Sequence, residues 1–329
     1  MKTIKKFLRL AKIYYSYKRG NSILSYKPIR LWIEPTNKCN LKCIMCPHSQ
    51  KEIHFEKGFM DMDIFKKIIR EAAHFGSDVN LFMGGESLLH PKLIDMIKYM
   101  KHKHIPSRLY TNGTLITPEI SEELIRSGLD HITFSFDGPH RETYENYRKG
   151  ASFEKTLENI RNFLSAKRAL NRKRPFTVIQ CLEFKEIDYN PEFKTQFKKL
   201  FDRKMVDSFT FIKPHSFGGV FKRYSTLKGH KDYSPCAFLW YSMSVMWDGT
   251  VVPCCVDMFK RYPIGNVQDS SLEELWNSDK LVNLREKIYR GEYEDIELCS
   301  ECDILWKKRI LGIPIKSFYN FADMIKSRL

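Results

Sequence analysis

The segment Thr36-Asn37-Lys38-Cys39-Asn40-Leu41-Lys42-Cys43-Ile44-Met45-Cys46-Pro47 carries three cysteines in the spacing C-x-x-x-C-x-x-C. It follows an apolar stretch, residues 30–36, that has the composition of a buried strand. In parallel α/β folds, active sites are built in the loops that follow the strands. Three thiolates on one such loop can hold a [4Fe–4S] cluster by three of its irons, which leaves the fourth iron open to another ligand.

A structural zinc ion is the alternative for this loop. Zinc sites of that kind use four ligands, and His48, two residues after Cys46, would have to supply the fourth. The polar motifs that follow the later strands have no explanation in a zinc site, and we therefore favour the iron–sulfur cluster.

The cysteine loop opens a regular alternation of strands and helices. Expected strands are residues 30–36, 79–83, 107–111, 131–136, 176–184 and 207–213, and expected helices are 62–74, 91–103, 118–127, 153–171 and 191–203. Six such units predict an α/β fold with right-handed parallel crossovers. They fall short of the eight of a closed TIM barrel, and the prediction is a partial (β/α)6 TIM-like barrel over residues 30–215.

The pattern changes after residue 215, and residues 216–329 are expected to form a small cysteine-rich domain with a tail. Residues 216–235 read as a linker. Residues 242–255 predict a hairpin with a type I′ turn at Asp248-Gly249. Residues 271–290 and the tail after Cys302 are expected to be helical.

A second group of cysteines lies in this C-terminal part. Cys236, Cys254, Cys299 and Cys302 can together hold one more metal centre, and Cys255 could take the place of Cys254 because neighbouring strand residues point to opposite faces. From spacing alone, a zinc site with four cysteine ligands competes with an iron–sulfur cluster.

Residues 1–29 form a basic arm with a predicted amphipathic helix. The formal net charge is +16; nine basic residues and no acidic ones lie in residues 1–30, so the remaining 299 residues carry only +7. This argues against nucleic-acid binding by the whole protein. The helix, over residues 3–15, would collect its apolar side chains on one side, namely Ile4, Phe7, Leu8, Ala11, Tyr14 and Tyr15.

Two interpretations of this helix are open. It can lie on an anionic membrane surface through residues 1–20, or it can pack its apolar side on its own domain and keep a solvated basic face, which we favour slightly. The sequence has no continuous apolar leader and no run long enough to span a bilayer, so a cytoplasmic location is expected, with peripheral membrane contact as an option.

Short polar motifs end the second, third and fourth strands. They are Gly84-Gly85-Glu86, Thr111-Asn112-Gly113 and Ser135-Phe136-Asp137-Gly138. The glycines would let the backbone approach a ligand closely, and Glu86 can accept a hydrogen bond from an ammonium group. Ordinary turns are the alternative interpretation of these motifs. Arg148, in the segment Tyr147-Arg148-Lys149-Gly150, is a further candidate for ligand binding, and an exposed loop charge is its alternative interpretation.

These motifs and their order resemble the radical S-adenosylmethionine (SAM) superfamily over about residues 30–215. The resemblance implies that the open iron binds SAM, which is cleaved reductively to a 5′-deoxyadenosyl radical that abstracts hydrogen from a substrate. It also implies that Met45 packs on adenine and that Gly84, Gly85 and Glu86 bind the SAM amino group. Asn112, Ser135, Asp137 and Arg148 would complete the SAM site, with Ser135 and Asp137 near the ribose or carboxylate and Arg148 on the carboxylate. Ser87 replaces the family's usual proline.

The C-terminal cysteines are similar to the SPASM or twitch domain of this superfamily. No cysteine follows Cys302, and one auxiliary [4Fe–4S] cluster is therefore expected. Cys181, in the fifth strand, is either a small buried side chain or, if it points into the barrel, a hydrogen donor to a substrate radical. His215, after the sixth strand, either faces the substrate or caps the sheet.

The expected substrate is a small molecule such as a sugar, a cyclitol or a lipid precursor. A peptide-modifying enzyme is the alternative, weakened by the lack of room for a peptide-recognition domain in residues 1–29. A non-catalytic iron–sulfur or zinc protein is the alternative from another class. An acidic flavodoxin or ferredoxin is the expected electron donor, because a basic surface would steer it.

Overall fold

The computed structural model describes residues 2–50, 54–221, 233–306, 309–310 and 313–314. Its first six strands follow the predicted alternation: β1 Arg30–Ile33, β2 Asp78–Leu81, β3 Ser107–Thr111, β4 His131–Ser135, β5 Phe176–Leu182 and β6 Ser208–Ile212. The nine-stranded sheet has the order β6-β5-β4-β3-β2-β1-β7-β8-β9. The pairs β3–β4, β4–β5, β5–β6 and β1–β7 are parallel. The predicted α/β fold, with a mostly parallel sheet, is confirmed.

The helices between these strands are α2 Met62–Phe75, α3 Leu93–His102, α4 Pro118–Arg126, α5 Arg141–Tyr147, α6 Phe153–Ala169 and α7 Pro191–Lys199. Side-chain caps fix several of their starts. Thr117 accepts a hydrogen bond from Ile120 N before α4, and Asn190 accepts one from Phe193 N before α7. Both caps are followed by a proline in the first turn, as the sequence predicted. The sequence did not predict α5.

Two compact units divide the chain, one of residues 1–33, 63–79 and 215–329 and the other of residues 34–62 and 80–214. One change of unit falls between Pro214 and His215. Residues 30–33 and 63–79, which lie in the expected barrel segment, group with the C-terminal part. The expected domain limits stay a prediction.

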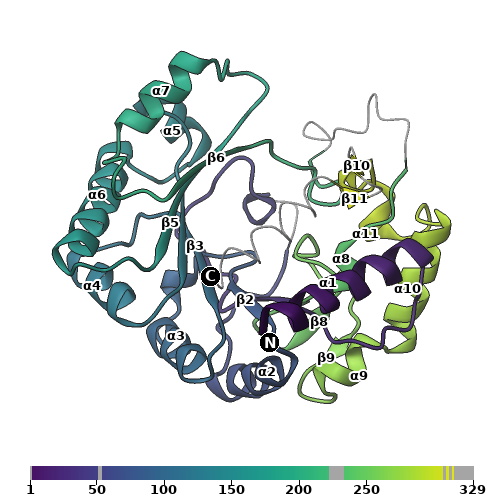
Figure 1. The fold of residues 1–329 in the computed structure, drawn as a ribbon. Coiled ribbons are helices and arrows are strands. Elements are labelled where there is room, and N and C mark those ends of the chain that lie inside the picture. Colours follow the sequence, from purple (N-terminus) through teal and green to yellow (C-terminus); the bar gives the residue numbers. More distant parts are fainter. Residues whose placement is uncertain (1, 51–53, 222–232, 307–308, 311–312, 315–329) are drawn as a thin grey trace. The chain divides into compact units, whose positions relative to one another are not determined.

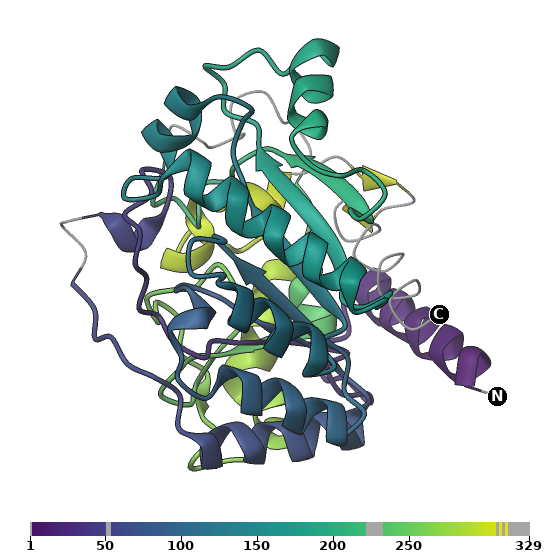
Figure 2. The same ribbon diagram turned by 90° about the vertical axis from the view of Figure 1, so that its left-hand side faces the viewer.

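In the second unit, α3, α4, α6 and α7 cover one face of strands β3–β6 (Figure 1), and Figure 2 looks onto this helical layer. Aromatic side chains fill the space between. Phe163 of α6 contacts Phe134 of β4, and Phe197 of α7 contacts Phe209 and Phe211 of β6. Burying each such ring contributes about 1.5–3 kcal/mol. This packing fixes which strand residues face the helices, and therefore which face the opposite side.

In the first unit, α8 Phe238–Tyr241, α9 Leu272–Trp276 and α10 Asp279–Arg290 accompany β7 Ser242–Val245, β8 Thr250–Val252 and β9 Gly265–Asn266. The fully buried Arg285 ties this unit together, donating to the carbonyls of Leu239, Ser22 and Trp276. The single helix predicted over 271–290 is interrupted: Asn277 ends α9, and Ser278 begins α10.

The predicted hairpin is confirmed as the antiparallel pair β7–β8, but its predicted turn type is wrong. Type I′ needs positive φ at both central residues. Here only Gly249 has a positive φ, 86°, and Gly249 N donates to Met246 O. This is the type I turn followed by a left-handed glycine that joins strands through a bulge.

The end of the chain holds α11 Glu297–Ser300, the 3-10 turn η4 Asp303–Trp306 and the short antiparallel pair of β10 Arg309–Ile310 and β11 Ile313–Pro314. The predicted helical tail is therefore wrong at these two strands. Residues 315–329, and residues 222–232 of the expected linker, lie outside the described part.

The N-terminal helix is α1 Lys2–Arg19, longer than predicted. Its buried side carries Ile13, Ser16 and Tyr17, whereas Phe7, Leu8 and Tyr15 of the predicted apolar side are exposed. The favoured interpretation, an apolar side packed on the domain, is wrong for these three residues. None of the described helices combines the length and the apolar composition needed to cross a membrane.

Candidate active site

The cysteine loop is held by backbone hydrogen bonds to the end of α5. Lys42 N donates to Lys149 O at 2.9 Å, and Ile44 N donates to Tyr147 O at 3.0 Å. Cys46 N closes the loop onto Cys43 O at 3.0 Å. The three thiols are electrostatic neighbours, since Cys43 and Cys39 both raise the pKa of Cys46.

Loss of solvent is the main influence on these thiols. It raises the pKa of Cys46 to about 12 and also raises that of Cys43. Such thiols stay protonated at neutral pH until a metal charge displaces the proton. Three neighbouring thiols on one anchored loop, short of the four ligands of a structural zinc site, fit a [4Fe–4S] cluster bound through three irons.

Arg148 stands directly beside this loop. Its side chain is only 8% exposed, and its Nη2 lies 2.8 Å from Asp137 Oδ2 in an ion pair. Burial is the largest single influence on the pKa of Arg148 and would lower it, but Asp137, Cys43 and Tyr144 together outweigh burial and raise the pKa. Arg148 therefore places a permanent positive charge next to Cys43, whose pKa it lowers against the effect of burial.

Glu86 connects the second and third strand-end motifs. Its carboxylate accepts hydrogen bonds from Leu88 N at 3.1 Å and Asn112 N at 2.7 Å, and its own N donates to Lys38 O at 2.8 Å. Burial raises the pKa of this carboxyl. Both carboxylate oxygens already accept backbone hydrogen bonds, so Glu86 positions the loops in addition to any role toward a ligand.

The two glycines before Glu86 are explained by packing. A Cβ at Gly85 would stand 2.4 Å from both Thr36 O and Lys38 O, and a Cβ at Gly84 would stand 2.2 Å from the ring of His48. Only glycine permits this approach of the Gly84-Gly85 turn to the cysteine loop. The ring of His48, the alternative zinc ligand, also packs against Phe55 at a tilt of 41°, with ring centroids 4.4 Å apart.

Asn112 links the third strand to the cysteine loop. Its Nδ2 donates to Asn40 Oδ1 at 3.0 Å, and its Oδ1 accepts from Thr114 N at 2.9 Å. Ser135 ends β4 half-buried, in register with Gln180 of β5. Met45 is buried in the loop. The roles of these residues toward SAM stay predictions.

Cys181 lies on the helix-covered face of the sheet. It is fully buried and in register with Phe211, which contacts Phe197 of α7. Directly paired residues of parallel strands point to the same face. This placement supports the interpretation of Cys181 as a small buried side chain. His215 accepts a hydrogen bond from Phe217 N at its Nδ1, in a local turn.

Two residues that sequence reasoning missed also hold this site. Glu34, one residue after β1, is fully buried and accepts a hydrogen bond from Gly84 N at 3.1 Å. Asn37 accepts one from Gly58 N at 3.0 Å and donates to Glu56 O. An acid at the end of an otherwise apolar strand was the available signal for Glu34.

The C-terminal cysteines gather in the first unit. Cys236, Cys254 and Cys302 are buried, while Cys255 and Cys299 are half-buried. Burial and then the neighbouring Cys302 raise the pKa of Cys236 to about 12, and Cys236 acts in turn on Cys254 and Cys299. Cys236 therefore neighbours the other three predicted ligands, and Cys255 lies close to it as well.

Within the described residues, no three Cys, His, Asp or Glu side chains gather at the spacing of one bound metal ion. A four-iron cluster takes each thiolate on a different iron, which requires a wider spacing.

A family model described as the radical SAM superfamily matches residues 33–171, and one described as an iron-sulfur cluster-binding domain (SPASM) matches residues 236–303. Residues 33–171 therefore form a radical SAM domain. The two matches cover the cysteine triplet and the C-terminal cysteines, respectively. The radical SAM domain implies SAM and a [4Fe–4S] cluster, and the SPASM domain implies an auxiliary cluster.

Relatives of this radical SAM protein cover nearly the whole chain. A tungsten-containing aldehyde ferredoxin oxidoreductase cofactor-modifying protein from Pyrococcus furiosus is 25% identical, over 90% of this chain and 99% of the relative. The PqqA peptide cyclase of Gluconobacter oxydans is 26% identical, over 84% of this chain and 83% of the relative.

Among solved structures, Streptococcus suis SuiB bound to the precursor peptide SuiA has a TM-score of 0.66 at 16% identity, over 91% of this chain and 80% of that one. At that identity, the likeness shows the fold.

Proposed function

We propose that this radical SAM enzyme modifies a peptide or protein side chain. The similarity to the PqqA peptide cyclase carries the proposal, because it extends over 84% of this chain rather than over the SAM domain alone. The small-molecule substrate expected from the sequence has less support, and the short arm of residues 1–29 does not outweigh this similarity.

The SAM-cleaving half of the reaction would take place at the cysteine loop. Cys39, Cys43 and Cys46 would hold the [4Fe–4S] cluster, which supplies the electron that cleaves SAM. Arg148 is suited to orient the SAM carboxylate, because a buried guanidinium binds carboxylates through paired hydrogen bonds. Glu86, Asn112, Ser135, Asp137 and Met45 are the other proposed contacts.

The edge of the sheet offers a place for an extended peptide. β6 stands at one end of the strand order, so among the described residues only β5 pairs with it. An exposed strand edge can accept a peptide as an additional strand. Thr210 of β6 has a buried hydroxyl with no hydrogen-bond partner in the described part of the chain, and it shares its sheet face with Gln180.

The proposal also includes an electron donor and a location. An acidic flavodoxin or ferredoxin would deliver electrons, drawn by the net charge of +16. A peripheral position at a membrane is proposed from the exposed side of α1.

Deuterium transfer tests the substrate class. The reconstituted enzyme should contain about eight irons per chain, given two four-iron clusters. It would be incubated with SAM, dithionite and an extract of fully deuterated cells, and deuterium in 5′-deoxyadenosine measured by mass spectrometry. We expect the transfer to disappear when the extract is first digested with a protease. The peptide proposal would be refuted if deuterium transfer survived the digestion and its source in the extract passed a small-pore filter, because that source would then be a small molecule.

A further inference from the structure

Among the described side chains of α1, those on one side fix the helix to the first unit. Arg9 Nη2 donates to Lys27 O at 2.9 Å and to Pro28 O at 3.1 Å, and Tyr17 OH donates to Pro235 O at 3.0 Å. The Tyr17 ring also meets Trp240 of α8 edge-on, with ring centroids 5.4 Å apart. These contacts hold the helix in one rotational setting.

That setting turns the predicted apolar side outward. Phe7, Leu8 and Tyr15 are 70%, 61% and 57% exposed. At positions i, i+1 and i+8, they share one face of the helix with the exposed Ala11. Buried anchors such as Ile13, 1% exposed, occupy the opposite face. We refer to Phe7, Leu8, Ala11 and Tyr15 as the outward face.

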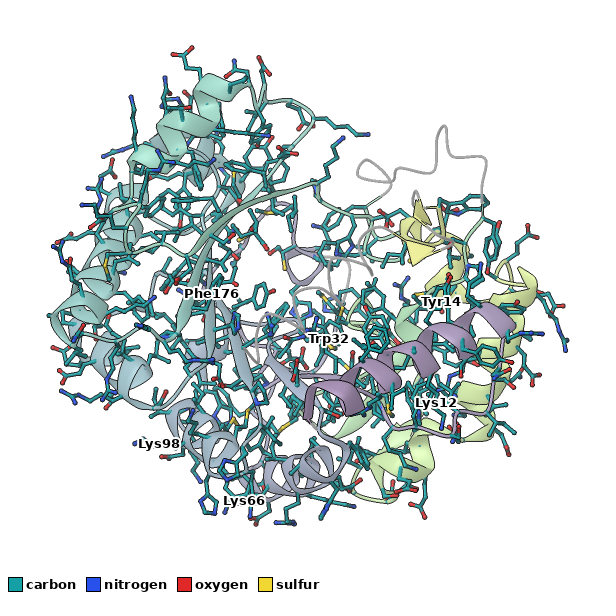
Figure 3. The ribbon with its side chains drawn as sticks, viewed as in Figure 1. Lys12, Tyr14, Trp32, Lys66, Lys98 and Phe176 are labelled. Carbon is teal, nitrogen blue, oxygen red and sulfur yellow. The ribbon has the colours of Figure 1, made fainter. Side chains whose placement is uncertain are left out.

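Basic side chains border the outward face. Lys12 and Lys18 are exposed, and the Arg19 guanidinium lies over the Tyr15 ring, 5.4 Å from its centroid. Figure 3 marks Lys12 and Tyr14 on this helix. An apolar and aromatic face with basic borders is typical of helices that lie in a membrane interface, where the long basic side chains reach the headgroups.

We propose that the outward face of α1 binds an anionic lipid surface, with the helix lying in the plane of the interface. Charge selects this occupant, because the exposed basic residues Lys12, Lys18 and Arg19 lie on the same helix and residues 1–30 contain no acidic residue. Pairing with a second copy would bring Lys12, Lys18 and Arg19 of both copies together, and like charges repel. The inference deepens the proposed peripheral location and does not depend on SAM cleavage.

Vesicle flotation tests the proposal on the full cluster-loaded chain under anaerobic conditions. The probes are phosphatidylcholine vesicles, with and without phosphatidylglycerol. We expect binding to the anionic vesicles only, weakened by added salt. The triple variant Phe7→Ser/Leu8→Ser/Tyr15→Ser should bind at least about tenfold less, because binding scales with buried apolar area. Lys12→Gln/Lys18→Gln should reduce binding to the anionic vesicles.

Phe176→Ser/Ile212→Ser is the matched control, since these apolar side chains are 39% and 36% exposed on β5 and β6. It should bind vesicles like the wild type. Unchanged iron content and melting temperature would show that the triple variant is folded. Failure of the wild type to float, or equal flotation of the triple variant, would refute the proposal. The proposal would also be refuted if the wild type bound no vesicles and instead formed a dimer that the triple variant could not form. Because flotation needs no turnover, a failure of SAM cleavage would count against the proposed enzyme and not against membrane docking.

Discussion

Arg148 and Asp137 face each other as a buried ion pair, with Arg148 Nη2 2.8 Å from Asp137 Oδ2. The other Asp137 oxygen accepts a hydrogen bond from Leu182 N at 2.8 Å. The pair therefore connects the end of α5, which anchors the cysteine loop, to the end of β5. It places a positive charge beside Cys43, and Asp137 compensates that charge.

Removing the guanidinium should damage both stability and chemistry. Arg148→Gln leaves the Asp137 carboxylate buried and uncompensated, which costs about 3–5 kcal/mol. The rate of 5′-deoxyadenosine formation should fall about 10- to 100-fold, because the variant loses one charge-assisted hydrogen bond. The double variant Asp137→Asn/Arg148→Gln should recover part of the stability and none of the rate. Chemical denaturation and a SAM-cleavage assay measure the two effects, and equal stability of the single and double variants would contradict the coupling.

Gly85→Ala should remove one cluster selectively. The new Cβ would stand 2.4 Å from Thr36 O and Lys38 O, and it must push the cysteine loop away from Glu86. Iron content is expected to fall from about eight to about four per chain, because the C-terminal cysteines are unaffected. Gly76→Ala is the control: of the residues that the structure describes, its Cβ would meet only the Arg9 guanidinium, at 3.6 Å. Because residue 76 has a positive φ, the alanine should lower the free energy of unfolding by about 1 kcal/mol. The iron content should stay unchanged.

Cys254 and Cys255 can be separated by iron analysis. Cys254 is buried next to Cys236, whereas Cys255 is half-buried. We expect Cys254→Ala to lose the auxiliary cluster, about four irons, and Cys255→Ala to keep it. Electron paramagnetic resonance of the reduced proteins would show which cluster signal is lost. The reverse pattern would assign Cys255 as the ligand.

Cys181→Ala should leave catalysis intact. The side chain shares a sheet face with Phe211, which packs on α7, so it does not face the open side of the strands. The substitution should cost about 1 kcal/mol of stability, as is typical of small losses in a core. Unchanged 5′-deoxyadenosine formation and product stereochemistry are expected. A loss of turnover with normal stability would restore the role of Cys181 as a hydrogen donor.

His90 should make the stability of the protein depend on pH. Burial lowers its pKa below the ordinary value of 6.5, with Met60 O and Lys92 N as hydrogen-bond partners of the ring. Below pH 6.5 the unfolded chain binds a proton that the folded chain does not. The free energy of unfolding should therefore fall toward acid pH by up to about 1.4 kcal/mol per pH unit. His90→Gln should flatten this part of the profile, and an unchanged slope in that variant would contradict the assignment.

The sequence by itself determined the two cysteine groups and the order of the first six strands. The spacing of Cys39, Cys43 and Cys46 is local, and so are the strand and helix periods around it. The caps at Thr117 and Asn190 lie next to the helices they begin. Features of this kind depend on a few consecutive residues, and they can be predicted without a partner.

The tertiary structure alone decided which residues meet and which way they face. Gly85 is explained by carbonyls about fifty residues earlier in the chain, and Arg148 is compensated by Asp137 across a strand-end loop. The face of Cys181 follows from the register with β6, and the outward face of α1 follows from the anchoring of Arg9 and Tyr17. Helical periodicity gives an apolar face and cannot say whether that face is packed or exposed. That depends on which contacts bury the most area and satisfy the most hydrogen bonds once the chain has folded.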